Sequence, residues 1–369
     1  MSELPPDLCF EILSRLEVGC LLRFRCVSRA WRRFIDDPIF IKLHLHRQFN
    51  AGQLILYNNI GMKHCILSLD SLNCYPTGMV VVETSRQGHE SRKPTLPVPS
   101  CNGLILIPND IENVLALWNP STRETHVLPS YTSTVLSSQQ EGCSSIAFGY
   151  DSATDDYKVV KIVVYYNQTT HECRCRSLVY SLKSNSWRKV KDCPHDVPTD
   201  RGVFVNGALH WTIDDELMIV AFDLATEDYY TLPLPSELSK LQEHSTLPIL
   251  DALGECLLVT WEGSVYRLDD YGGKNSWTKL FSLSDMGMGN ARLIAYSKTK
   301  EEVLLWANTT RECFWFDIEN LFLKKVRIAG AQDYWYFQIC QPSIVRLSNS
   351  DGVDGNKLQI EEQEEEDES

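Results

Sequence analysis

The sequence has no long apolar run and no recognisable secretion signal. None of its apolar stretches approaches the roughly eighteen residues that a membrane-spanning helix needs. The first residues, Met1 to Asp7, show neither the basic start nor the apolar stretch of a signal peptide. We therefore expect a protein of the cytosol or nucleus that has no membrane partner.

The sequence also lacks the common signatures of catalysis. It contains no Gly-x-Ser-x-Gly elbow, no Walker phosphate loop and no His-Glu-x-x-His zinc motif. Gly287-Met288-Gly289 lacks the third glycine and the flanking helix of a dinucleotide site. Acidic residues are plentiful, but no pair stands out as a catalytic dyad. These absences predict a protein that has no cofactor and no catalytic residues of its own.

Thirteen cysteines are present, but their number is odd, they are scattered, and no two have the spacing Cys-x-x-Cys. In a reducing compartment they are best interpreted as small buried hydrophobic residues. His171, Cys173 and Cys175 alternate, so on a strand their side chains would share one face, as metal ligands can. No second pair with the spacing of a zinc site follows, and His44 and His46 are equally isolated. We therefore expect no metal site.

The charge is acidic, with 49 Asp and Glu against 35 Lys and Arg and a formal net charge of −14. The segment from Ser348 to Ser369 contains one lysine and nine acidic residues. So polar a segment cannot form a core, and we predict that residues 348–369 are a disordered acidic tail. An acidic body repels phosphate backbones, so we expect no nucleic-acid partner.

The first forty residues carry a helical pattern. Leu8, Ile12 and Leu16 recur every four positions and form one apolar face of a first helix, which we expect to end near Glu17–Gly19. A second and a third helical piece continue the apolar set to Pro38, where we expect the pattern to stop. So short a segment cannot bury all of its large side chains by itself. A partner or the next domain must cover part of them.

From about Leu54 onward the chain changes to short β-branched and aromatic runs separated by turn residues. Asn102-Gly103 and Asn206-Gly207 are signals of tight hairpins. An apolar strand followed by a polar turn and a second strand recurs at Leu67–Leu72, Leu117–Thr122, Val179–Ser184, Ala221–Thr226, Val265–Asp269 and Trp315–Glu319. The mean interval of about 49 residues is typical of a four-stranded propeller blade. We therefore predict a large all-β, β-propeller-like domain of about six blades, from roughly residue 50 to residue 347.

Several stretches match known families in order. The helical segment matches at Leu4–Leu8, Glu11–Leu16, Leu21–Trp31 and Asp37–Phe40, and it resembles an F-box from end to end. The β region matches at Ser100–Leu104, Trp118–Arg123, Phe148–Asp151, Asp155–Val160 and Asn185–Trp187. These segments resemble the plant F-box-associated or kelch-like domain, in the group that includes the S-locus F-box proteins. The two resemblances cover nearly the whole chain apart from the acidic tail.

The resemblance implies a small all-α F-box in residues 1–45 and a target-binding propeller in residues 50–347. In this family the F-box binds a Skp-family adaptor and, through it, cullin and RING subunits, while the second domain recruits a protein for ubiquitination. The positions that match the F-box core or its adaptor surface are Leu4, Pro5, Leu8, Ile12, Leu16, Leu21, Leu22, Val27 and Trp31. The sequence leaves open which of them are core residues and which are contacts. It does not identify the target or the residues that bind it.

The resemblance therefore implies the substrate-recognition subunit of an SCF ubiquitin ligase, a receptor that is not itself an enzyme because thioester chemistry belongs to the ubiquitin-conjugating partner. One alternative is an F-box protein that binds the adaptor but forms no ligase. Another is a kelch-type propeller that acts as an enzyme or a glycan-binding protein, although such a protein has no need of the F-box residues.

Two clusters allow a functional and a structural interpretation. Arg23, Arg25, Arg29, Arg32 and Arg33 could face an acidic adaptor or simply lie on a solvated helix face. The aromatic run Tyr334–Phe337 could fill the core between blades or form a target-contact patch.

Overall fold

The computed structural model describes sixteen parts of the 369-residue chain. They are residues 6–47, 53–58, 63–69, 80–83, 99–109, 114–131, 141–166, 173–195, 202–213, 218–238, 248–271, 277–297, 299–307, 310, 312–326 and 336–347. The predicted acidic tail lies outside the described residues.

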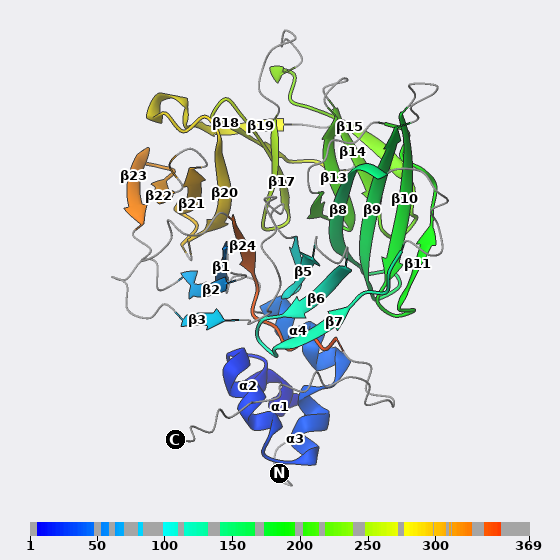
Figure 1. The fold of residues 1–369 in the computed structure, drawn as a ribbon. Coiled ribbons are helices and arrows are strands. Elements are labelled where there is room, and N and C mark those ends of the chain that lie inside the picture. The colour runs from blue at the N-terminus through cyan, green and yellow to red at the C-terminus, as the bar shows by residue number, and fades with distance from the viewer. Residues whose placement is uncertain are drawn as a thin grey trace, which may run out of the picture.

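Within the described residues 6–47, four short helices form the N-terminal unit at the foot of the molecule in Figure 1. They are α1 (Pro6–Leu13), α2 (Val18–Arg25), α3 (Arg29–Ile35) and α4 (Pro38–Arg47). The first helix ends at Leu13, four residues before the end that the apolar spacing predicted. Helix α3 begins where the Ser28 hydroxyl accepts a hydrogen bond from the Trp31 N–H, a typical N-terminal cap.

The fourth helix begins at Pro38, where we expected the helical pattern to stop. Pro38 occupies the first helical position, where a missing N–H costs nothing. The Asp37 carboxylate precedes it and accepts the N–H groups of Ile39 and Phe40 at 2.8 and 3.3 Å. The Asp-Pro pair is therefore the start signal of α4, and the expectation of an end at Pro38 was wrong.

In the part of the chain that the structure describes, the β domain forms six four-stranded antiparallel sheets, which we number as blades 1 to 6. Blade 1 contains β24 (Tyr336–Cys340), β1 (Gln53–Asn58), β2 (Lys63–Ser68) and β3 (Val80–Glu83). Blade 2 contains β4 (Ser100–Cys101), β5 (Leu104–Asn109), β6 (Val114–Asn119) and β7 (Glu124–Val127). Blade 3 contains β8 (Glu141–Asp151), β9 (Asp156–Tyr166), β10 (Cys173–Ser181) and β11 (Ser186–Lys189).

The remaining three blades follow the same order along the chain. Blade 4 contains β12 (Val203–Val205), β13 (Ala208–Ile213), β14 (Met218–Asp223) and β15 (Tyr229–Pro233). Blade 5 contains β16 (Ile249–Leu253), β17 (Cys256–Trp261), β18 (Ser264–Leu268) and β19 (Trp277–Ser282). Blade 6 contains β20 (Ala291–Tyr296), β21 (Glu302–Ala307), β22 (Glu312–Asp317) and β23 (Phe322–Val326).

The first strand of each blade contacts the first strand of the next, from β4 through β8, β12, β16 and β20 to β24, which in turn contacts β4. These contacts close the ring that Figure 1 shows. The C-terminal strand β24 pairs antiparallel with β1, from Gln53 opposite Cys340 to Tyr57 opposite Tyr336, so the two ends of the β domain meet in one blade. The prediction of a propeller of about six blades is confirmed.

The repeat in the sequence corresponds to the outer half of each blade. Every copy begins in the third strand counted from the axis, β2, β6, β10, β14, β18 or β22. At the end of β6, β14 and β22, the side chains of Asn119, Asp223 and Asp317 accept N–H groups two and three residues later. Such turns explain why a polar residue ends the strand in these three copies. The two Asn-Gly hairpins also formed, between β4 and β5 and between β12 and β13.

A buried histidine lies within blade 4. His210 is on β13, a strand whose residues are all buried, and its Nδ1 lies 3.1 Å from the Val203 carbonyl oxygen. Its ring stands edge-on to Tyr271, with 5.4 Å between ring centres. Among the described residues, its Nε2 has no hydrogen-bond partner. Burial therefore lowers the pKa of His210 to about 4, because a second proton would be buried without a partner.

We expect this histidine to make the protein less stable in mild acid. The unfolded chain takes up the proton near its ordinary pKa of 6.5, whereas the folded chain does so only at about 4. Acid in this window therefore favours the unfolded state, by about 1.4 kcal/mol per pH unit. In urea unfolding at about pH 7 and about pH 5, His210→Gln should lose this part of the pH dependence. The exposed His46 supplies the control His46→Gln, and equal slopes for the wild type and His210→Gln would contradict the assignment.

Candidate protein-interaction site

Exposed apolar side chains concentrate on the helices. Among the residues that the structure describes, five of the eight exposed large hydrophobic side chains belong to α1–α4 and the turns between them. They are Leu8, Ile12, Phe24, Val27 and Ile39, with exposed fractions from 39% to 73%. Large apolar side chains gathered in water on so small a unit are typical of a surface that binds another protein.

The structure sorts the nine residues that the sequence singled out. Leu8, Ile12 and Val27 are exposed, whereas Leu21 is fully buried. The half-buried residues Leu16, Leu22 and Trp31 pack against the core of the helices. Leu4 and Pro5 lie outside the described residues.

Two exposed residues, Phe24 and Ile39, were not among the predicted contacts. The Phe24 ring lies against Trp31, with 5.6 Å between ring centres, and Phe24 is 39% exposed. Ile39 stands at the start of α4, a helix that the sequence pattern did not predict.

Ion pairs between helices fix the orientation of the apolar face on α1. Leu8 and Ile12 are four residues apart, so they lie on the same side of the helix. The Glu11 carboxylate on α1 bonds Arg47 of α4 and Arg15, which lies in the turn just after α1, and these contacts lower the pKa of Glu11 to about 2. Arg47 also donates to the Glu11 carbonyl oxygen at 3.1 Å. These contacts between α1 and α4 therefore hold Leu8 and Ile12 in one orientation relative to the other helices.

The basic cluster divides into a structural and an exposed part. The Arg25 guanidinium donates two hydrogen bonds to the Asp36 carboxylate, at 2.5 and 3.0 Å, and joins α2 to the end of α3. Arg32 contributes a longer ion pair to Asp36, at 3.7 Å. Arg23 on α2 and Arg29 and Arg33 on α3 are exposed. Within the cluster, these three are the candidates for an acidic partner.

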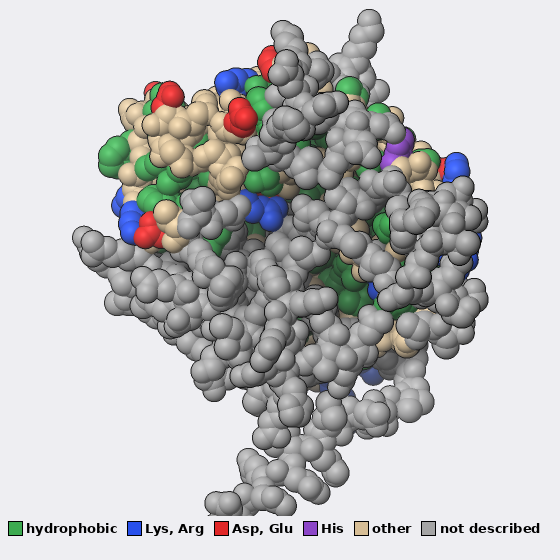
Figure 2. Space-filling model, turned by 45° about the horizontal axis from the view of Figure 1, so that its top comes forward, with side chains coloured by type: hydrophobic (Ala, Val, Ile, Leu, Met, Phe, Trp, Pro, Cys, Tyr) green, Lys and Arg blue, Asp and Glu red, His purple; other side chains and the backbone are tan. Residues whose placement is uncertain are grey.

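The helices rest on one end of the propeller, as Figure 1 shows for α4. Lys42 of α4 pairs with Asp155, in the turn between β8 and β9, at 2.8 Å. Ile41 and Leu45 pack against the hydrophobic core that blades 2 and 3 share. The helices therefore contact the end of the propeller that carries the turn between β8 and β9. The opposite end of the propeller faces away from the helices. Figure 2 shows apolar, acidic and basic side chains together on the described part of the face that is turned forward there.

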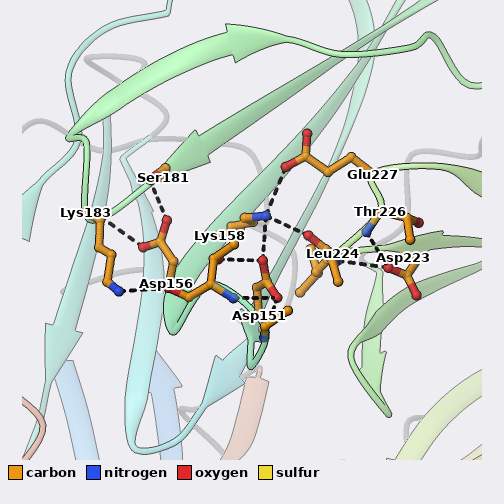
Figure 3. A network of polar contacts seen from close by, with 12 residues as sticks. Asp151, Asp156, Lys158, Ser181, Lys183, Asp223, Leu224, Thr226 and Glu227 are labelled. Atoms are coloured by element: carbon orange, nitrogen blue, oxygen red, sulfur yellow. Dashed lines mark hydrogen bonds and ion pairs between the residues drawn. The ribbon is translucent and has the colours of Figure 1, made fainter.

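A polar network joins blades 3 and 4 (Figure 3). The Lys158 ammonium group on β9 donates to the Glu227 carboxylate at 2.9 Å and to the Leu224 carbonyl oxygen at 2.6 Å, and it pairs with Asp151 at 2.8 Å. The side chains of Lys158 and Asp151 are only 6% and 1% exposed. Burial alone would lower the pKa of Lys158, but the bonds to the two carboxylates together raise it above its ordinary value.

This network is a joint between blades rather than a reactive site. An ammonium group has three N–H donors, and the three acceptors around Lys158 use all of them. A lysine that acts as nucleophile or base needs a lowered pKa, whereas the pKa of Lys158 is raised. The Asp-Asp-Tyr-Lys segment was part of the family resemblance, but its partner Glu227, which lies on the next blade, was not predicted.

The candidate metal ligands do not form a site in the described part of the chain. No group of three or more His, Cys, Asp or Glu residues with metal-binding geometry occurs there. His171 lies outside the described residues, and the Cys175 thiol is 3.5 Å from the His195 carbonyl oxygen. His44 is buried with its Nε2 2.9 Å from the Leu16 carbonyl oxygen. The side chains of the aromatic run Tyr334–Phe337 also lie outside the described residues.

None of the described helices is both long and apolar enough to cross a membrane.

Comparisons with known proteins match both parts of the fold. A family model described as F-box domain matches residues 1–43, and one described as F-box associated beta propeller domain matches residues 59–347. F-box protein CPR1 of Arabidopsis thaliana is 30% identical over 380 residues, covering 94% of this chain and 89% of that protein. A second F-box protein of that plant is 30% identical, with coverage of 87% and 85%, and an F-box/kelch-repeat protein is 27% identical, with coverage of 76% and 79%.

Proposed function

Because the chain belongs to the F-box proteins that carry an F-box associated beta propeller domain, we propose that it is the substrate-recognition subunit of an SCF ubiquitin ligase. The F-box would bind a Skp-family adaptor and, through it, the cullin and RING subunits. The propeller would hold a protein target for ubiquitination and degradation by the proteasome. The receptor would work in the cytosol or nucleus, where these partners occur.

The observation that carries this proposal is the set of exposed apolar side chains on the F-box. Leu8, Ile12 and Val27 are 49%, 53% and 67% exposed, although they belong to a unit whose inner apolar residues are almost fully buried. A few desolvated anchors of this kind supply most of the binding energy in a protein interface. The exposed Arg29 and Arg33 would add attraction toward an acidic adaptor surface.

The proposal assigns no catalytic step to this chain. Burial raises the pKa of the Cys313 and Cys340 thiols to about 12, so neither supplies a thiolate at neutral pH. The receptor contributes by holding its target near the ubiquitin-charged conjugating enzyme, which raises the effective concentration of the reacting groups.

Reconstitution tests the proposal. The purified chain should form a stoichiometric complex with a Skp-family adaptor, and ubiquitin transfer should require adaptor, cullin and RING subunits in addition to the activating and conjugating enzymes. Stable adaptor binding without ligase activity would favour the alternative of a non-ligase F-box protein. Ubiquitin carried as a thioester on a cysteine of this chain would contradict the non-catalytic assignment.

A further inference from the structure

The segment that follows β24 runs between the propeller and the F-box, and we name residues 341–347 the C-terminal strap. Ile344 is 3% exposed and belongs to the hydrophobic core of the F-box, with Leu13, Leu21 and Phe40. Its neighbour Val345 is 6% exposed and belongs to the hydrophobic core that blades 2 and 3 share. Adjacent residues of the strap therefore fill two different cores.

Hydrogen bonds hold the strap to blade 2. The Asn119 side-chain amide donates to the carbonyl oxygens of Ser343 at 3.1 Å and Val345 at 2.8 Å. The Ser343 N–H donates to the Ser121 hydroxyl at 3.2 Å, and the Leu347 N–H donates to the Glu124 carboxylate at 3.0 Å. Asn119 and Ser343 are both 0% exposed. Several hydrogen bonds to the backbone of the strap therefore fix its path along blade 2, and no single contact holds it alone.

The strap fits closely against the turn between β4 and β5. Gly103 has a φ of +80°, and a Cβ atom on it would lie 2.4 Å from the Ser343 Cβ atom. Only glycine suits this position, because the backbone conformation and the approach of the strap both exclude a side chain.

Polar contacts also hold the strap to the F-box. Arg346 lies between the two domains and pairs with Asp36 of the F-box at 3.5 Å and with Glu124 of β7 at 2.5 Å. Asp36 is the carboxylate that Arg25 and Arg32 also bind, so Arg346 joins the ion-pair cluster that fixes α2 and α3. The side chain of Gln341 donates to the Leu45 carbonyl oxygen at the end of α4.

We propose that the C-terminal strap is a structural part of the F-box, so that the adaptor-docking surface is stable only when β24 has closed the propeller. The four helices are too short to bury their apolar residues alone, and Ile344 fills the space that they leave. The strap leaves β24 directly, so it can reach the F-box only from a closed blade 1. A chain whose propeller is open or incomplete would then fail to recruit a ligase.

Two neighbouring substitutions in the full-length chain test this proposal. Ile344→Ser should lower the amide hydrogen-exchange protection of α1–α4 by about a hundredfold, because it leaves a cavity in the F-box core. Val345→Ser removes a similar side chain one residue away and should act chiefly on blades 2 and 3, β4–β11. Identical protection profiles for the two variants, or unchanged protection of α1–α4 in Ile344→Ser, would overturn the proposal. If Ile344→Ser does not fold, Ile344→Val should still lower the protection of α1–α4 severalfold.

The consequence for adaptor recruitment rests on the proposed function, so it is measured separately. Ile344→Ser should weaken binding of a purified Skp-family adaptor at least tenfold, because the adaptor must first order the F-box. Unchanged affinity in a variant whose helices have lost protection would overturn the coupling between strap and docking surface. If the wild type itself does not bind the adaptor, the proposed function fails, and the exchange experiment still decides whether the strap completes the F-box.

Discussion

Replacing Leu8 and Ile12 together by serine should lower the affinity for a Skp-family adaptor by at least about a hundredfold, with little effect on folding. Both side chains lie on one side of α1 and are 49% and 53% exposed, so the folded chain loses little when they are shortened. In a complex they would be buried, and each anchor of this kind contributes about 2 kcal/mol or more. Isothermal titration with purified adaptor, together with thermal unfolding of the free variant, measures both effects.

The propeller supplies a matched control. Leu321 and Phe322 in blade 6 are 56% and 65% exposed, so Leu321→Ser with Phe322→Ser removes a comparable amount of exposed apolar surface far from α1 in the sequence. This variant should bind the adaptor like the wild type. Equal losses in the two double variants would mean that general surface apolarity, and not the α1 face, drives the binding. An unchanged affinity in the α1 variant would remove α1 from the docking surface.

The sequence predicted the class of the fold well because the signals are local. The polar turns that follow β6, β14 and β22 contain Asn119, Asp223 and Asp317, whose side chains bond the turn backbone, so these three blades carry the same local marker. The recurrence of the strand-turn-strand pattern predicted the number of blades. Likewise, Asn206-Gly207 predicted a hairpin because both residues adopt a positive φ there.

Long-range partners left no such mark. Ile344 is more than three hundred residues from Leu21, although both belong to the same hydrophobic core. From its sequence neighbours alone, Ile344 would be assigned to the last part of the β domain. Lys158 likewise gave no sign of its partner Glu227, because the contact depends on how blade 4 stands beside blade 3. The sequence also could not separate the exposed Ile12 from the buried Leu21, since both belong to the same apolar set of the helical segment. Only the packing of the helices decides which side faces water.

The buried lysine of the joint between blades 3 and 4 should be one of the most sensitive positions in the propeller. Lys158→Met keeps the length of the side chain but removes its charge, and Asp151, which is 1% exposed, then loses its cation. Breaking a buried ion pair from one side costs about 3 to 5 kcal/mol, because the remaining charge stays buried. We expect the free energy of unfolding, measured in urea near neutral pH, to fall by about this amount.

Lys183→Met is the matched control within the same network. Lys183 is 58% exposed and reaches Asp155 only at 4.0 Å, so its loss should cost less than about 1 kcal/mol.

The loss of stability in Lys158→Met should also become smaller in acid. Hydrogen bonds from Lys158 help hold the pKa of Asp151 and Glu227 below the ordinary 3.8 and 4.5, despite burial, which raises both. The stability that these pairs contribute is therefore present above the ordinary values and lost as the pH falls below them. Equal costs for the two lysine substitutions would show that water screens the joint, and that Lys158 does not hold the two blades together.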